Sequence, residues 1–221
     1  AFWGYKTDGL IQTQEQLNAV KRADFQPNAE LGDVLFVDTN GDGKLDSSDR
    51  CMIGNPIPDI IYGINMGMAW KGFDLNLQFG GTIGNQIFNA MRYYTYFPND
   101  ITNKDRALMN YWTPNNTNTD IPRLTATDVN DNDRFSDMYV ENGTYFRLRN
   151  AQLGYTLPAS LTQRIKLQKV RFYVSGQNLF TISSYSGMDP EVGQSSSLSR
   201  GIDYGIYPQN ISFTGGINVT F

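Results

Sequence analysis

Residues 38–49 form an acidic segment whose spacing is typical of a calcium-binding loop. Oxygen-bearing side chains recur at the first, third, fifth, ninth and twelfth positions, as in the EF-hand loop, and a glycine at the sixth permits the sharp turn. Because Ca²⁺ prefers about six to eight oxygen ligands, we expect these groups to converge on one ion. The predicted ligands are the side chains of Asp38, Asn40, Asp42, Asp46 and Asp49 and the carbonyl of Lys44.

The same loop also fits an ion-free turn, because Asp, Asn and Gly are residues that tight turns favour. Asp49 stands where an EF-hand has a bidentate Glu, so the sequence predicts weaker or differently shaped coordination. Residues 34–37 read as a short strand and not as the helix that precedes an EF-hand loop. We therefore interpret the loop as a structural staple in an extracellular region, where calcium near the millimolar range saturates even a weak site.

The composition excludes several functional classes. The chain has no histidine and one cysteine, Cys51, so it cannot by itself form a His-based triad, a structural zinc site or a disulfide framework. Its 18 basic and 22 acidic residues give a net charge of −4, which gives no reason to expect a nucleic-acid partner. We interpret Asp189 and Glu191 as loop-structuring residues, and we predict no catalytic residue and no enzyme activity.

Five segments alternate between apolar and polar residues with the period of two that marks β-strands. They lie within residues 62–79 (two strands), 151–157, 170–182 and 211–221. The tight turn at Lys71-Gly72 joins the first two strands into a hairpin. One face of every strand is apolar and carries no charge, whereas the other is small or polar. Because a charge facing lipid costs about 2–4 kcal/mol near the membrane midplane, this pattern favours a membrane-facing surface over a soluble β-sandwich.

The connections between these strands alternate between short and long, as in barrels that have short periplasmic turns and long external loops. The long connections are residues 83–143 and 184–208, and residues 1–58 belong with them. The short connection at 158–168 is predicted to hold a short helix, with Ser160 as its N-cap and Gln163 completing a capping box.

Five strands cannot close a membrane barrel, which needs at least about eight. Since the last strand runs to Phe221, we expect the chain to be the C-terminal part of a larger, all-β transmembrane antiparallel barrel. In this division residues 1–58 are an extracellular region that contains the acidic loop, and residues 59–221 supply the last five barrel strands with their external loops. No stretch approaches the roughly 18 consecutive apolar residues that a membrane helix needs.

A linear series of short motifs resembles the C-terminal part of SusC/RagA-family TonB-dependent outer-membrane transporters. The motifs are Gly4-Tyr5-Lys6-Thr7-Asp8-Gly9, Gln12-Thr13-Gln14, Gly32-Asp33 leading into the acidic loop, Ile53-Gly54-Asn55-Pro56, Gly143-Thr144-Tyr145-Phe146-Arg147-Leu148-Arg149-Asn150, Leu153-Gly154-Tyr155-Thr156-Leu157-Pro158, Val174-Ser175-Gly176-Gln177-Asn178-Leu179-Phe180 and Tyr185-Ser186-Gly187-Met188-Asp189-Pro190-Glu191. The series covers nearly the whole chain.

This resemblance implies a barrel of about 22 strands in the bacterial outer membrane, with a plug and further strands upstream of this chain. It also implies a SusD-like surface lipoprotein that covers the barrel as a lid, and import of oligosaccharide or peptide driven by TonB through the plug. A soluble calcium-dependent carbohydrate-binding sandwich and a passive porin-type barrel are the alternative functions.

Aromatic residues of the long connection 83–143 are candidate substrate contacts, because flat amphipathic rings stack on sugar or peptide. The candidates are Tyr93, Tyr94, Tyr96, Tyr111 and Trp112. Packing within the loop or against the lid is the competing interpretation for each. Arg147 and Arg149, placed just before the third strand, and Arg171, on the polar face of its neighbour, are expected to line the lumen.

Overall fold

The computed structural model describes residues 1–96, 103–192 and 199–221. The chain divides into two compact units. Unit 1 comprises residues 1–57, 86–142 and 192–206, and unit 2 comprises residues 58–85, 143–191 and 207–221. Residues 1–57 thus belong to the same unit as most of the two long connections.

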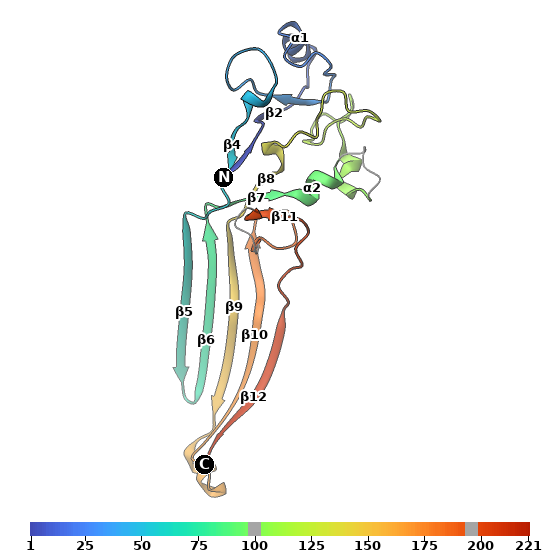
Figure 1. The fold of residues 1–221 in the computed structure, drawn as a ribbon. Helices are drawn as coiled ribbons and strands as arrows, with labels where there is room; N and C mark the ends of the chain where they lie inside the picture. Colours follow the sequence, from blue (N-terminus) through green and yellow to red (C-terminus); the bar gives the residue numbers. More distant parts are fainter. Residues whose placement is uncertain (97–102, 193–198) are drawn as a thin grey trace. The chain divides into compact units, whose positions relative to one another are not determined.

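Unit 2 is built on one antiparallel sheet of five strands (Figure 1). Its strands are β5 (Ile60–Trp70), β6 (Phe73–Ile83), β9 (Tyr145–Thr156), β10 (Lys169–Ser183) and β12 (Ser212–Thr220). They lie side by side in the order β12-β10-β9-β6-β5, so each strand pairs with the next barrel strand along the chain. The five predicted strands are therefore confirmed.

The predicted hairpin is also confirmed, and its turn has a clear backbone cause. β5 and β6 pair continuously from Ile60 opposite Ile83 to Trp70 opposite Phe73. The two turn residues, Lys71 and Gly72, have φ values of 47° and 88°. A two-residue loop with positive φ at both positions matches the twist of the flanking strands.

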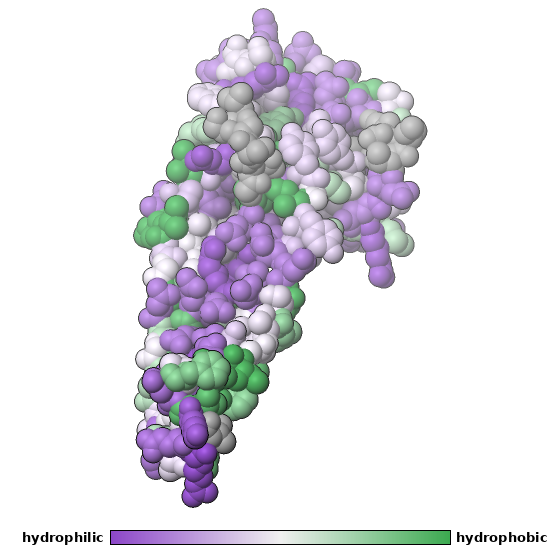
Figure 2. Space-filling view, turned by 60° about the horizontal axis from the view of Figure 1, so that its bottom comes forward, coloured by the Kyte–Doolittle hydropathy of each residue, from purple (hydrophilic) through white to green (hydrophobic). Residues whose placement is uncertain are grey.

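The two faces of the sheet differ in chemistry as the sequence predicts. The apolar face is exposed, with Met68 66%, Val174 61% and Phe213 77% accessible. Figure 2 shows one side of the molecule, with hydrophilic side chains across its middle and hydrophobic ones at the left edge and in a patch toward the lower end. Within the described part of unit 2 no second sheet packs on this face.

Two local predictions in unit 2 are wrong. The connection holds the short helix α3 (Ala159–Thr162), followed by the 3₁₀ turn η4 (Gln163–Ile165). The N-cap of α3 is Pro158, which makes no side-chain capping bond, so Ser160 is not the cap and Gln163 completes no capping box. Proline fixes φ at this position and has no side-chain acceptor that could form a capping bond. Arg147 and Arg149 do not precede the third strand but lie within β9, because strand pairing continues beyond the alternating segment through a bulge.

The long excursion between β6 and β9 is closed at its base by hydrogen bonds. The Gly143 N–H donates to the Asn85 carbonyl over 2.9 Å. The Gly84 N–H donates to the Thr144 hydroxyl over 3.2 Å. The excursion therefore leaves and rejoins the sheet at one place.

Unit 1 consists of short elements, most of which lie in segments that the sequence predicts as loops. They are β1 (Phe2–Gly4), β2 (Thr7–Leu10), α1 (Gln14–Arg22), β3 (Val34–Phe36), η1 (Ser47–Asp49), β4 (Cys51–Gly54), β7 (Gln86–Asn89), α2 (Ala90–Thr95), η2 (Arg106–Asn110), η3 (Asp137–Tyr139), β8 (Val140–Asn142) and β11 (Ile202–Asp203). The predicted strand at 34–37 is confirmed as β3. Pairs β1–β4 and β2–β3 form two small sheets, and β7 lies between β11 and β8 in a third.

Three small apolar clusters hold unit 1 together. One contains Tyr5, Leu10, Phe25, Val34, Phe36 and Trp112. A second contains Phe2, Phe88, Ala90 and Tyr139, and a third Ile11, Leu17 and Ala29. Helix α1 begins at a capping box in which the Thr13 hydroxyl accepts from the Gln16 N–H. None of the helices in the described part of the chain is long and apolar enough to cross a membrane.

Candidate functional site

The first half of the acidic loop is held by hydrogen bonds from its own backbone. The Asp38 carboxylate accepts from the N–H groups of Gly41, over 2.6 Å, and Gly43, over 2.9 Å. The Asn40 and Asp42 side chains each accept from the N–H two residues further on. The Gly43 N–H is the main cause that lowers the pKa of Asp38 below its usual value. Glycines with φ of 79° and 76° at positions 41 and 43 make these turns possible.

The second half of the loop ends in a buried carboxylate. Asp46 caps η1 by accepting from the Ser48 N–H, which lowers the pKa of Asp46. Asp49 is fully buried and accepts from the N–H groups of Thr39 and Asp46, each over 3.0 Å. Within the described residues no group of three or more His, Cys, Asp or Glu side chains is placed to hold a metal ion. The calcium assignment stays a prediction that rests on the spacing and on the oxygen donors.

The aromatic candidates occupy two different surroundings. Tyr93 and Tyr96 pack, half-buried, against the Phe88 and Tyr139 cluster, and the Arg92 guanidinium lies 4.8 Å from the centre of the Tyr96 ring. Tyr94 is 49% exposed and meets Tyr93 edge-on. Tyr111 is half-buried. Burial raises the pKa of both Tyr93 and Tyr96, so these phenols stay neutral at physiological pH.

Trp112 lies in the core of unit 1. Only 6% of its surface is accessible, and its indole N–H donates to the Gln12 side-chain oxygen over 2.9 Å. The ring packs directly on Gly32, whose φ is 86° and where a Cβ atom would overlap the ring. In this position Trp112 stabilises the unit, and substrate contact by aromatic residues stays a prediction, with Tyr94 the most accessible of the five candidates.

A buried ionic cluster stands on the polar face of the sheet. The Arg147 guanidinium reaches Asp189 over 2.5 Å and Glu191 over 2.8 Å, and Glu191 also pairs with Arg149 over 3.0 Å. Arg147 is 2% and Asp189 5% exposed. Asp189 also accepts from the Gln209 N–H, so it joins both ends of the connection between β10 and β12. These contacts are of the kind expected if Asp189 and Glu191 structure the loop, as predicted.

A second ion pair on the same face spans a whole strand. Arg171 in β10 donates two hydrogen bonds to Asp74 in β6, although β9 lies between these strands. The guanidinium crosses β9 at Gly154, where a Cβ atom would lie 2.3 Å from it. Gly80 leaves the same kind of space for Arg149. The sequence predicted that Arg171 lies on the polar face, whereas the crossing depends on register, which period-two alternation does not reveal.

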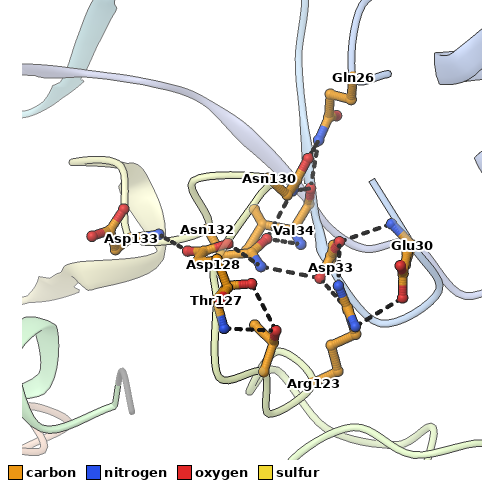
Figure 3. A network of polar contacts seen from close by, with 11 residues as sticks. Gln26, Glu30, Asp33, Val34, Arg123, Thr127, Asp128, Asn130, Asn132 and Asp133 are labelled. Atoms are coloured by element: carbon orange, nitrogen blue, oxygen red, sulfur yellow. Dashed lines mark hydrogen bonds and ion pairs between the residues drawn. The ribbon is translucent and has the colours of Figure 1, made fainter. Parts of the chain in front are cut away.

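A polar network in unit 1 was not foreseen from the sequence (Figure 3). Asp33 is fully buried and accepts from Arg123 over 2.6 Å, from the Asn132 side-chain amide over 3.0 Å and from the Glu30 N–H over 2.8 Å. Asn130 and Gln26 continue the network to the backbone of β3. Its members join residues 26–34 to residues 123–132, which are far apart in the sequence, and no local signal marks such a partnership.

The chain is similar in sequence to TonB-dependent receptors along its whole length, although no family model matches it. TonB-dependent receptor P3 of Formosa agariphila is 38% identical over 100% of this chain, and receptor P26 of the same organism is 32% identical over 100%. TonB-dependent receptor SusC of Bacteroides thetaiotaomicron is 29% identical over 89% of the chain. The chain spans 22% of the first two proteins and 18% of the third.

Solved structures give the same picture. The structure of the RagAB peptide transporter matches 100% of this chain, and 22% of its own chain, with a TM-score of 0.75 and 26% identity. Structures of the RagAB peptide importer in its closed-closed and open-open states also give a TM-score of 0.75.

Proposed function

Because the chain belongs to the SusC/RagA family of TonB-dependent receptors, we propose that it contributes five wall strands to an outer-membrane barrel that imports nutrient oligomers. The observation that carries the proposal is the asymmetric sheet. One of its faces is apolar and exposed, the other bears ion pairs, and its edge strands β5 and β12 pair with no further strand among the described residues. This combination suits a wall between lipid and a polar lumen.

The proposed partners are a plug and upstream strands of the same receptor, TonB as the source of energy, and a SusD-like surface lipoprotein as a lid. The relatedness to SusC and to the RagAB transporter supports this assignment and argues against a passive porin. Oligosaccharide and peptide are the two candidate ligand classes, and unit 1, on the extracellular side, is the proposed place of first contact.

The test of import is uptake by cells. A strain that carries the complete receptor and its lipoprotein should accumulate labelled oligosaccharides or peptides, and deletion of TonB should abolish accumulation while leaving receptor levels unchanged. Accumulation that continues without TonB would point to a passive pore.

A charge placed on the apolar face should prevent membrane assembly. Met66 is 52% exposed on that face of β5, and its neighbour Asn65 is exposed on the polar face. Met66→Lys should lower the free energy of unfolding of the complete receptor in the membrane by about 2–4 kcal/mol if the site lies near the midplane. We expect a severalfold drop in folded receptor in outer-membrane fractions, measured by heat-modifiable migration. Asn65→Lys is the matched control, and equal levels of the two variants would contradict a lipid-facing surface.

We further propose that the acidic loop binds Ca²⁺ as a structural ion. The donors are oxygen atoms alone, which suits a hard cation, and the residues Asp38, Asn40, Asp42, Lys44, Asp46 and Asp49 retain EF-hand spacing. Binding would require the Asp49 carboxylate to break its hydrogen bonds with the N–H groups of Thr39 and Asp46 and to rotate toward the ion. The ion would then tie the loop to the end of β3.

Calorimetric titration of the complete receptor tests this site. Wild type should bind one Ca²⁺ more than the variant Asp38→Ala/Asp42→Ala, and saturation should stabilise unit 1 by about 2.7 kcal/mol at a hundredfold excess over Kd. Asp8→Ala removes an exposed carboxylate outside the loop and is the matched control. Equal stoichiometry for wild type and the double variant would show that the loop is an ion-free turn.

A further inference from the structure

Unit 1 contains a polar pocket beside the acidic loop. Its volume is about 310 Å³, near the lower end of the range for small-molecule sites. Three segments line it: residues 24–28 after α1, residues 44–45 of the acidic loop, and residues 129–134. Most of its lining is polar, and Phe25, Leu45 and Val129 supply a smaller carbon surface.

The back of the pocket is fixed. Gln26 is 2% exposed, and its side-chain amide donates to the Val34 carbonyl and the Asn130 side chain while its oxygen accepts from the Phe36 N–H. Asn130 is 6% exposed and donates in turn to Asn132. These two wall residues belong to the network of Figure 3 and are saturated, so they hold the pocket's shape.

The front of the pocket presents uncommitted polar groups. Among the described residues, the side chains of Asp24, Asn28 and Lys44 make no hydrogen bond or ion pair, although all three line the pocket. The other two charged side chains of the lining, Asp131 and Arg134, form an ion pair with each other over 3.0 Å. A carboxylate and an amide from residues 24–28 and an ammonium from the acidic loop therefore line one space whose total charge is zero.

We propose that this pocket binds one neutral sugar residue of a glycan. Hydroxyl groups both donate and accept, so a single sugar ring can accept from Lys44, donate to Asp24 and do both with Asn28. A charge-balanced lining gives no preference for an ionic ligand. All lining residues lie in loops or turns, so the pocket has no strand edge that could add a peptide as a further strand.

The inference rests on the proposed function, since it names the ligand class that the receptor would capture, but the site can be tested apart from import. Detergent-purified complete receptor with its lipoprotein is applied to an array of neutral oligosaccharides and, in parallel, to an array of short peptides. Asp24→Ala and Lys44→Met should each weaken binding to the neutral glycans at least about tenfold, as expected for loss of a hydrogen bond to a charged group. Asp8→Ala, exposed outside the pocket, should bind like wild type.

Asn28→Ala is a second kind of variant, because it removes a neutral group and leaves the pocket's charge unchanged. A similar loss for this variant supports direct hydrogen bonding to the ligand. Glycan binding that all three pocket variants retain would overturn the site while leaving import intact. Binding of peptides alone, or of no glycan on the array, would overturn the ligand class. If cells with the wild-type receptor showed no TonB-dependent uptake, this result would count against import and not against the pocket.

Discussion

Replacing Arg147 by Met should destabilise the connection between β10 and β12 by about 3–5 kcal/mol, because the change leaves the buried Asp189 carboxylate without its cation. Asp189 holds the N–H groups of Glu191 and Gln209, which lie on the two sides of this connection. Hydrogen exchange of these two amides in the complete receptor measures the effect. Their exchange should accelerate by more than about a hundredfold, since about 1.4 kcal/mol corresponds to a factor of ten.

Arg149→Met is the matched control for this change. Arg149 pairs with the same Glu191, yet its side chain is 42% accessible, and exposed pairs contribute only about 0–1 kcal/mol. The amides at positions 191 and 209 should exchange almost as in wild type. Equal acceleration in the two variants would mean that burial does not set the strength of the cluster.

The same cluster predicts a dependence on pH. Burial alone would raise the pKa of Asp189, but the N–H groups of Gln209 and Glu191 and the Arg147 guanidinium outweigh it and lower the pKa below 3.8. Because the pKa is lower in the folded state, the ionised Asp189 stabilises the fold in full above the unfolded pKa near 3.8. This stabilisation is lost as the pH falls through the pKa of the folded state. Protection of the Gln209 amide should therefore be constant from neutral pH to about pH 4 and decrease below it.

Asp33→Ala should cost unit 1 about 3–5 kcal/mol, because Arg123 loses the buried carboxylate that it contacts through its Nε atom over 2.6 Å. Asn132 and the Glu30 N–H lose the same acceptor, so residues 26–34 and 123–132 should separate more often. The Arg123 N–H, which donates to the Gly32 carbonyl, reports this opening through its exchange rate.

Glu30→Ala provides the comparison, since Glu30 also pairs with Arg123, over 2.9 Å, but its side chain is 60% accessible. This variant should lose less than about 1 kcal/mol. If Glu30→Ala opened the network as much as Asp33→Ala does, the buried pair would not be its main source of stability.

The barrel strands could be predicted from the sequence because each of them carries its own signal. A strand between lipid and lumen needs an uncharged face, so alternation at positions such as Leu75, Asn76 and Leu77 specifies both the strand and its orientation. The positive-φ turn at Lys71 and Gly72 likewise depends on neighbouring residues alone. Local patterns sufficed wherever the structure follows local rules.

Unit 1 could not be predicted in the same way, because its stability comes from contacts between distant segments. The sequence marks Trp112 as a candidate substrate contact or a packing residue without telling which, whereas in the structure Gly32, eighty positions earlier, makes room for its ring in the core. The side-chain partners of Asp33, Arg123 and Asn132, lie 90 and 99 residues away. The elements of unit 1 are two to nine residues long, too short to show a reliable period.

The hydrogen bonds at Asn85 and Thr144 give the receptor wall a form of modularity. Since the excursion begins and ends at one clasp, its content can be lengthened, shortened or replaced while β6 and β9 keep their pairing, and the entropic cost of a longer loop grows only slowly with its length. Mutation can thus change the residues of the excursion while the pairing of β6 and β9 stays the same. If the excursion contacts ligand as proposed, receptors with the same sheet can differ in their ligands by exchange of this insert alone.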